Sequence, residues 1–230
     1  MKLLNYKKIC HNVNVKIKKS KLNFQNFGNA SVRIDKDYFV IKPTGINLDK
    51  VDYSDYPIIS IKTQKRVSGK LIESTDTLTH LSLYKNYKNI NSIIHTHSKY
   101  AVIFSQSKVT IPILGTTHAD YWNENILVTK SLKKSDVSHD YQHNIAKSII
   151  ECLKKRDPLL YPGILVANHG PFCWGFNAAE TFLNAERLEF IAELAYKTLI
   201  LNRRTKAINA YLINKHFYRK NGSLKYYGQK

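Results

Sequence analysis

Two histidines that could hold a metal ion together follow the apolar stretch Ser92–Ile94, where His95 and His97 are separated by one residue. Side chains alternate between the two faces of a β-strand, so both imidazoles would lie on the same face. A third histidine, His169, follows another apolar stretch, Gly163–Val166. Zinc accepts imidazole ligands in this number. The spacing alone leaves two interpretations open: a metal site, or unrelated histidines at strand ends.

Three polar segments could contact an anion such as phosphate. Two of them, Asn26–Ser31 and Lys42–Gly45, are glycine-containing turns next to predicted strands. The third precedes a helical period of leucines, which predicts Ser74 or Thr75 as the N-cap and Asp76 in the first turn. Backbone N–H groups of such turns and of helix N-termini bind anions. The alternative for each is an ordinary one, because glycine turns are common and most first-turn aspartates only offset the helix dipole.

The chain of 230 residues carries 36 Lys and Arg against 17 Asp and Glu, a formal charge of +19. Such an excess can indicate a nucleic-acid partner. The lysines are scattered singly and in pairs among Asn, Ile and Tyr, all residues with AT-rich codons. We therefore attribute the excess to genome composition and expect no nucleic acid. A net positive field would still favour an anionic, phosphorylated substrate.

The three cysteines, Cys10, Cys152 and Cys173, indicate a reducing compartment. Their odd number and the lack of a CxxC pair argue against a disulfide framework and a Cys-ligated structural zinc. The basic stretch 1–20 has no apolar run of signal-peptide length, and no segment approaches the roughly 18 consecutive apolar residues of a membrane span. We expect a cytoplasmic protein without a membrane partner.

Apolar periodicity and turn residues predict helices and strands that alternate along one compact chain. Helices flank the strands on both sides, and several early strands are joined by short turns. This order predicts a single domain over residues 1–230, a three-layer α/β/α sandwich with a mixed or mostly antiparallel central sheet. Among the predicted elements are a helix within 1–20, strands 38–41 and 109–113, and helices 135–154 and 205–215.

Eight motifs spread over nearly the whole chain are similar to those of the L-ribulose-5-phosphate 4-epimerases, within the class II aldolase superfamily. The His-x-His pair and the late histidine are shared by the superfamily, whereas the block Gly115–Tyr121 and the terminus Tyr226–Gln229 are typical of the epimerases. The motifs are Gly28-Asn29-x-Ser31, Lys42-Pro43-Thr44-Gly45, Ser74-Thr75-Asp76-Thr77-x-Thr79-His80, His95-Thr96-His97-Ser98, Gly115-Thr116-Thr117-His118-Ala119-Asp120-Tyr121, His169-Gly170-Pro171-Phe172-x-Trp174-Gly175, Asn214-Lys215-His216-Phe217 and Tyr226-Tyr227-Gly228-Gln229.

The resemblance implies one divalent metal ion per subunit, zinc or another divalent ion. Its ligands by that resemblance are His95, His97 and His169, with Asp76 as an additional ligand. A phosphorylated pentulose is the implied substrate. The positions that match the substrate pocket are Gly28, Asn29, Thr44, Gly45, Ser74 and Thr75, and those that match the surroundings of the site in less defined roles are Lys42, Thr116, His216 and Arg219.

The implied reaction interconverts L-ribulose 5-phosphate and D-xylulose 5-phosphate. The C3–C4 bond is cleaved, the aldehyde fragment rotates, and the bond forms again on its other face. Proton transfer at the C4 hydroxyl on either face requires two groups, and Asp120 and Tyr227 match the family's pair. In the family this tyrosine reaches a neighbouring subunit, so the tail 216–230 is expected to contribute to the active site of a homo-oligomer, typically a tetramer. Both L-arabinose and L-ascorbate breakdown could supply this substrate.

The chain departs from the epimerase pattern in three places. Phe27 replaces Trp, Glu73-Ser74-Thr75 replaces Pro-Ser-Ser, and Gln142 replaces a Glu near the acid/base groups. Loss of that charge could shift the pKa of Asp120 or reduce turnover. The alternative enzyme is a class II sugar-phosphate aldolase of the fuculose-phosphate type, which Asp76 and the tail tyrosine disfavour. A metal-free structural domain, as in adducin, is disfavoured by the presence of all four ligand types.

Overall fold

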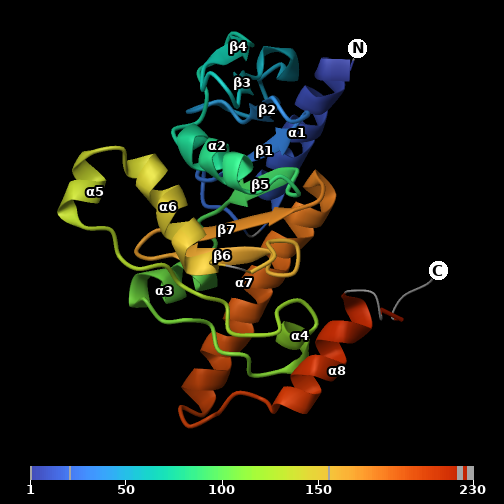
Figure 1. Ribbon diagram of the computed structural model, residues 1–230, viewed down its shortest axis with the longest axis vertical. Helices are drawn as coiled ribbons and strands as arrows, with labels where there is room; N and C mark the ends of the chain where they lie inside the picture. Colours follow the sequence, from blue (N-terminus) through green and yellow to red (C-terminus); the bar gives the residue numbers. More distant parts are fainter. Residues whose placement is uncertain (1, 21, 155, 222–224, 227–230) are drawn as a thin grey trace.

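A seven-stranded sheet forms the centre of the protein, and each pair of neighbouring strands is antiparallel (Figure 1). The computed structural model describes residues 2–20, 22–154, 156–221 and 225–226. In spatial order the strands are β4 (Arg66–Ser68), β3 (Ile58–Ser60), β2 (Tyr38–Ile41), β1 (Asn29–Arg33), β5 (Ser92–His95), β7 (Gly170–Gly175) and β6 (Gly163–Val166).

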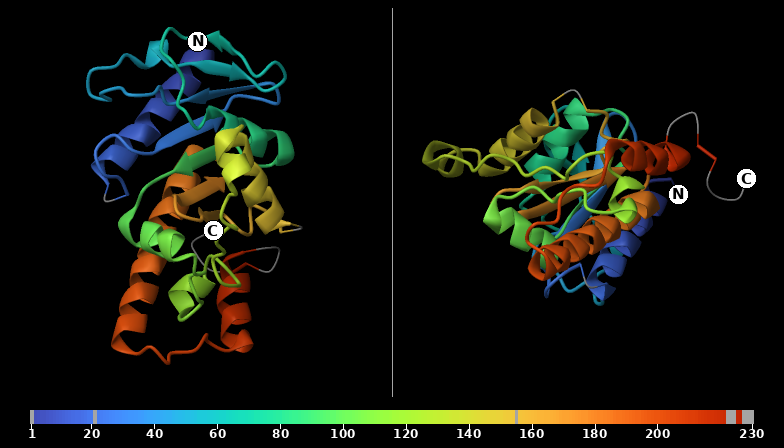
Figure 2. Two further views of the ribbon diagram at one scale, coloured as in Figure 1. Left: turned by 90° about the vertical axis from the view of Figure 1, so that its left-hand side faces the viewer. Right: turned by 90° about the horizontal axis from the view of Figure 1, so that it is seen from below.

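Helices cover both faces of this sheet, which makes the three layers visible in Figure 2. One layer holds α1 (Lys2–Lys19), α3 (Lys99–Ser107) and α7 (Ala178–Leu201), and the other holds α2 (Thr77–Asn86) and α6 (Tyr141–Leu153). The central strand β5 is buried along its whole length, as expected of an apolar strand covered on both sides. The predicted α/β/α sandwich is confirmed, and its sheet is antiparallel.

Four further elements complete the fold. They are η1 (Tyr53–Asp55), α4 (Thr116–Ala119), α5 (Lys134–Ser138) and α8 (Ala210–Lys220). The helices α4 and α8 pack side by side, away from the β4 edge of the sheet (Figure 1). Among the residues that the structure describes, no helix combines the length and the apolar composition that crossing a bilayer requires.

Three predicted elements need correction. The segment 109–113 is not a strand, because Pro112 has no N–H to donate and only Ile111 pairs, in an isolated bridge with Ile126. The predicted helix 135–154 is two helices, since Asp140 between α5 and α6 has a left-handed φ of 53°. The predicted helix 205–215 begins later, after Asn209, whose side chain accepts a hydrogen bond from the N–H of Leu212 as an N-cap.

Candidate metal centre

The antiparallel sheet brings the three histidines of the sequence prediction to one place. His95 is the last residue of β5 and pairs with Phe172 of β7. His97 lies two residues beyond the end of the strand, which corrects the expectation that both histidines belong to it. His169 lies in the turn between β6 and β7, where Asn168 has a left-handed φ of 60°. Strand pairing therefore positions residues that are more than 70 positions apart in the sequence.

The imidazole nitrogens of this cluster converge. His95 Nε2 lies 3.0 Å from His97 Nε2. One ligand atom from each of His95, His97 and His169 falls within 4.8 Å of the others. Carboxylate and imidazole sites for zinc place their ligand atoms about 2 Å from the ion, which requires a spacing of this kind. The three histidines thus have the spacing that a shared metal ion requires.

Hydrogen bonding leaves the lone pairs of the cluster available for a cation. His95 Nδ1 lies 3.0 Å from the carbonyl oxygen of Pro171, which can only accept, so Nδ1 carries the proton and Nε2 is bare. This is the arrangement of metal-binding histidines. His169 Nδ1 is buried and has no hydrogen-bond partner within the described part of the chain. A divalent cation fits this set because it accepts electron pairs from unprotonated imidazole nitrogens; in this structure the bare Nε2 of His95 contacts His97 Nε2 instead.

Burial keeps the three imidazoles neutral, the form that binds metal. It lowers the pKa of His95 well below 6.5, and the neighbouring His169 and His97 lower it further. Burial also lowers the pKa of His97 and of His169, and in both cases attraction to Asp76 opposes the effect. The cluster is accordingly uncharged at neutral pH before any cation binds.

Each histidine of the cluster has an aromatic ring against it. Phe172 stacks on His95 at a centroid distance of 4.3 Å, and Phe27 stacks on His97 at 5.3 Å. Tyr141, the first residue of α6, lies near-parallel to His169 at 6.4 Å. The epimerase pattern that the sequence resembles has Trp at the position of Phe27, which is also an aromatic residue. Sequence reasoning did not identify Tyr141, because only the packing of α6 on α2 carries it to the cluster.

Asp76 lies beside the histidine cluster and not within it. The predicted N-cap at Ser74 or Thr75 is wrong, since Asp76 itself occupies the N-cap position of α2. Its carboxylate makes no capping hydrogen bond. Instead, Asp76 Oδ2 accepts a hydrogen bond of 2.6 Å from Asn29 Nδ2. The carboxylate is therefore not used to stabilise the helix end, and its role as a metal ligand stays a prediction.

A cavity of about 320 Å³ opens in front of the cluster. This volume falls within the range of small-molecule sites. The cavity is lined by all the positions predicted for the substrate pocket, by Lys42 and by Gln142; the predicted positions are Gly28, Asn29, Thr44, Gly45, Ser74 and Thr75. A larger cavity of about 640 Å³ lies among α1, α3 and α7, but the histidine cluster does not line it.

Two loops pair with each other to form the wall opposite the histidines. The N–H of Thr44 donates to the carbonyl of Ile72, and the N–H of Ser74 donates to the carbonyl of Lys42. Their backbone donors are thus occupied, and what these two residues can offer an anion is their hydroxyls. The Lys42 side chain is only 7% exposed, and its Nζ donates to the carbonyl of Asn26 at 3.3 Å.

Gly28 allows the loop before β1 to pack against the end of β5. Its φ of 77° is left-handed, and a Cβ there would approach the carbonyl oxygen of His95 to 2.6 Å. A side chain at this position would be strained by conformation and by space. The glycine thus sets how closely the neighbouring Asn29 approaches the metal centre.

Four predicted site residues lie away from this cavity. Asp120, Thr116, His216 and Arg219 are not among its lining residues and instead belong to α4, α8 and their junction. Tyr227 lies outside the residues that the structure describes. The single chain therefore separates the predicted acid/base group Asp120 from the predicted metal ligands.

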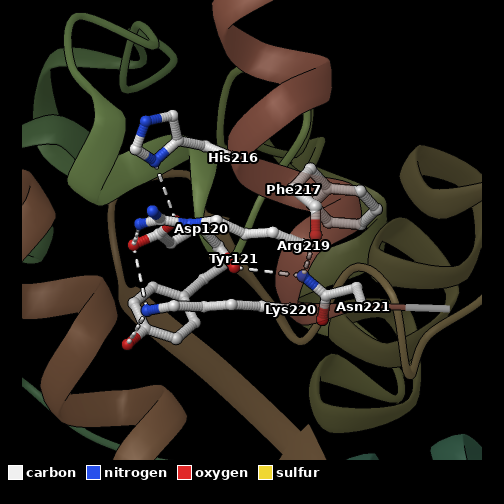
Figure 3. A network of polar contacts seen from close by, with 7 residues as sticks. All are labelled: Asp120, Tyr121, His216, Phe217, Arg219, Lys220 and Asn221. Atoms are coloured by element: carbon white, nitrogen blue, oxygen red, sulfur yellow. Dashed lines mark hydrogen bonds and ion pairs between the residues drawn. The ribbon is translucent and has the colours of Figure 1, made fainter. Parts of the chain in front are cut away.

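The carboxylate of Asp120 is held by basic side chains of the C-terminal helix (Figure 3). Asp120 Oδ1 accepts hydrogen bonds from His216 Nδ1 at 3.0 Å and from Arg219 Nη2 at 2.9 Å. Lys220 Nζ lies 2.9 Å from Oδ2. Asn221 Nδ2 donates to the Asp120 backbone carbonyl at 3.0 Å. Together these contacts fix the start of the C-terminal tail against Asp120.

Two opposing effects set the pKa of Asp120. Partial burial raises the pKa, but hydrogen bonds from Lys220, His216 and Arg219 outweigh it and hold the pKa below 3.8. At neutral pH the group is a carboxylate, so in a proton transfer it would begin as a base.

Two buried histidines should make the free energy of unfolding of the metal-free protein depend on pH. Burial lowers the pKa of His80 from 6.5 to about 3 and that of His118 from 6.5 to about 4. Below pH 6.5 the unfolded chain takes up protons that these folded imidazoles do not, so the free energy of unfolding falls with falling pH. At about pH 5 the loss is roughly 2 kcal/mol for each group. Urea midpoints in chelator at about pH 7.5 and about pH 5 test this prediction, and equal midpoints would contradict it.

The chain belongs to the family of the class II aldolase and adducin N-terminal domain, whose family model matches residues 10–196. Solved structures share its fold. An L-fuculose 1-phosphate aldolase superposes with a TM-score of 0.77 at 20% identity, over 92% of this chain and 94% of that one. YgbL from Klebsiella pneumoniae, assigned provisionally as an aldolase, epimerase or decarboxylase, gives 0.74 at 20% identity, over 92% and 97%. A sugar-phosphate aldolase from Thermotoga maritima gives 0.67 at 20% identity, over 86% and 96%.

These comparisons confirm the sequence prediction at the level of the superfamily. They do not distinguish the epimerases from the aldolases, because identities of this size carry the fold alone. The narrower assignment therefore rests on the motifs and on the chemistry of the site.

Proposed function

We propose that the protein is a metal-dependent epimerase that interconverts L-ribulose 5-phosphate and D-xylulose 5-phosphate. The observation that carries this proposal is the contact between Asp120 and α8. The resemblance pairs Asp120 with Tyr227 of the tail as the two proton-transfer groups, and side chains of α8 hold the start of that tail at Asp120. An aldolase that releases its fragments has no need of a second proton-transfer group on the opposite face of C4.

In this proposal His95, His97 and His169 hold the divalent cation, and Asp76 joins them as the fourth ligand. When bound, the cation supplies Lewis-acid stabilisation of the negative charge that carbon–carbon cleavage leaves on the substrate. Asp76 is one methylene shorter than the glutamate that acts as a base in the aldolases of the superfamily. The shorter side chain favours a place on the cation over a place at the substrate carbon.

The cavity has the charge that a phosphorylated sugar requires. Asp76 is its single carboxylate among the described lining residues, Lys42 is its cationic side chain, and the histidines are neutral. A bound divalent cation leaves a net positive site, which attracts a phosphate dianion. We assign the phosphate to the hydroxyls of Thr44, Ser74 and Thr75 with Lys42 beside them.

The separation of Asp120 from the cavity supports an active site made by two subunits. We propose a homotetramer in which α4, α8 and the tail of one subunit, residues 216–230, complete the cavity of the next. Apolar residues on α7 beside α4 are exposed in the single chain, including Phe190 at 53% and Leu194. Contact with a second copy would cover them.

A class II sugar-phosphate aldolase is the second candidate. One observation favours it: Gln142 lies in the cavity wall, where the epimerases have Glu. A neutral amide cannot exchange a proton or tune a neighbouring carboxyl as a glutamate does. In this case C3–C4 cleavage of a pentulose phosphate would end with release of two products.

Product analysis separates the two candidates. Zinc-loaded protein is incubated with L-ribulose 5-phosphate, and the products are identified by NMR. The epimerase converts it to D-xylulose 5-phosphate, whereas the aldolase releases dihydroxyacetone and glycolaldehyde phosphate. Chelator-treated protein is the control. If protein with bound zinc forms neither set of products, the proposal is overturned.

A further inference from the structure

The start of helix α3 is capped by a side chain from another helix. The first N–H groups of a helix have no acceptor within it, and the N-cap residue usually supplies one. Within the described ranges of the chain, the N-cap residue Ser98 makes no capping hydrogen bond with its side chain. The carboxylate of Glu189 on α7 takes its place. Glu189 Oε1 accepts from the N–H of Tyr100 at 2.9 Å, and Oε2 accepts from the N–H of Ala101 at 3.0 Å.

The loop that carries one predicted metal ligand ends at this capped helix. Strand β5 ends at His95 and α3 begins at Lys99, so only the residues 96–98 join them. Pairing with β1 and β7 fixes the end of the strand, and Glu189 fixes the start of the helix. Three residues between two fixed ends have little freedom to move. The position of α3 therefore determines where His97 lies.

The far end of α3 contacts the loop of a second predicted ligand. The carbonyl oxygen of Ser105, in the last turn of α3, accepts a hydrogen bond of 2.9 Å from the N–H of Asn168, which precedes His169. On the other side of this histidine, Gly170 lies beside α3, since a Cβ there would be 3.6 Å from the side chain of Val102. A shift of α3 would therefore displace both histidine-bearing loops relative to β5.

The cap from α7 ties α3 to a firmly packed part of the protein. Helix α7 packs against β5 and β7 as well as against α3, and Leu188, next to Glu189 in the sequence, is fully buried. A cap made by Ser98 would satisfy the helix end equally well but would not join two helices. The carboxylate also suits the positive end of the α3 dipole. Glu189 thus fixes α3 in relation to the sheet that carries His95.

We propose that Glu189 is a positioning residue of the metal centre, which sets the spacing of His97 and His169 in the histidine cluster by holding α3 against α7. It is not a ligand, because it lines the larger cavity among α1, α3 and α7 and not the cavity in front of the histidines. The inference rests on the proposed metal site and adds to it a group that touches neither cation nor substrate. Residues that orient metal ligands affect both affinity and geometry.

Zinc affinity measured against a chromophoric chelator tests the proposal. Glu189→Gln keeps the length of the side chain but offers one acceptor oxygen to two N–H groups, and zinc should bind about 10-fold more weakly. Glu189→Ala removes both hydrogen bonds, so its loss should be larger, up to about 100-fold. The visible spectrum of the cobalt-loaded protein depends on ligand geometry and should change in both variants. Circular dichroism and urea midpoints of the metal-free proteins check folding, and Glu189→Gln keeps the test valid if Glu189→Ala does not fold.

A matched control removes another helix cap. The side chain of Asn177 caps α7 by accepting from the N–H of Glu180 at 2.9 Å. It follows the end of β7 where Gly175 pairs with Ser92, the first residue of β5, away from the histidine cluster. Asn177→Ala should lower the urea midpoint as loss of a cap does, yet leave zinc affinity and the cobalt spectrum unchanged.

Two results would overturn the inference. The first is wild-type zinc affinity and cobalt spectrum in the folded Glu189 variants. The second is an equal loss of zinc affinity in Asn177→Ala, since the loss would then follow general stability and not the position of α3. Wild-type protein that binds neither zinc nor cobalt would instead overturn the proposed function on which the inference rests.

Discussion

Replacing His97 by Asn removes zinc from the protein and lowers its turnover on the order of 10³-fold or more, since charge stabilisation at the reacting centre is lost. His97 is half-buried and lies two residues beyond the end of β5, so the change should leave the fold intact. Its Nε2 faces that of His95 at 3.0 Å, and an asparagine side chain is too short to bring a ligand atom to that point. Zinc content by mass spectrometry, measured with turnover, tests the prediction.

A matched control for this variant is Phe27→Leu. It removes the ring that stacks on His97 and leaves the imidazole in place. We expect Phe27→Leu to retain zinc and most of the turnover, because it removes packing without removing a ligand. An asparagine variant with a full complement of zinc would exclude His97 as a ligand.

Asp120→Asn is expected to lower turnover by about 10²- to 10⁴-fold, the usual contribution of a positioned acid/base group. Zinc content should not change, because Asp120 does not line the cavity in front of the histidines. The amide nearly preserves the shape of the carboxylate beside Arg219 and Lys220 but cannot accept a proton. Steady-state kinetics with metal analysis distinguish this outcome from a general loss of structure. Loss of zinc in parallel with turnover would contradict the assignment.

A mixing experiment with these two inactive variants tests whether the site is shared between subunits. His97→Asn lacks the ligand but keeps Asp120, and Asp120→Asn has the opposite defect. The two variants are mixed in equal amounts, unfolded together and allowed to reassemble. If each site lies between two neighbouring subunits of a ring of four, about one quarter of the sites would combine an intact histidine cluster with an intact Asp120. Turnover recovered to about that level supports the shared site, and no recovery from an assembled mixture excludes it.

The positions of His95 and His169 at the ends of buried strands could be predicted from the sequence, because they depend on the pattern of apolar residues. Apolar runs ending in His95 and near His169 indicate buried strands with histidines at their ends, and the structure brings the two histidines together. The segment 109–113 shows the limit of that reasoning. Its apolar, β-branched residues are typical of a strand, but a strand also needs a partner over several residues, and here one bridge forms.

Features that depend on contacts between distant segments could not be predicted from local pattern. The helix is interrupted at Asp140, and α6 then begins with Tyr141 stacked near His169. The sequence 135–154 gives only a weak signal of this break, because aspartate is one of the few residue types that adopt a left-handed backbone conformation. The hydrogen bonds between α8 and Asp120 likewise join residues nearly 100 positions apart. For Asp76, Tyr227 and the substrate pocket, the roles came from resemblance and stay predictions.

The hydrogen bond from His95 to the carbonyl of Pro171 ties metal binding to the order of folding. His95 and its acceptor belong to strands that pair only after a chain segment of more than 70 residues has been closed into a loop, a slow, non-local event. A slip of one residue in the pairing of β5 with β7 would turn His95 to the opposite layer. If the histidines bind a cation as proposed, its uptake would follow the formation of the native register and would report when that register has formed.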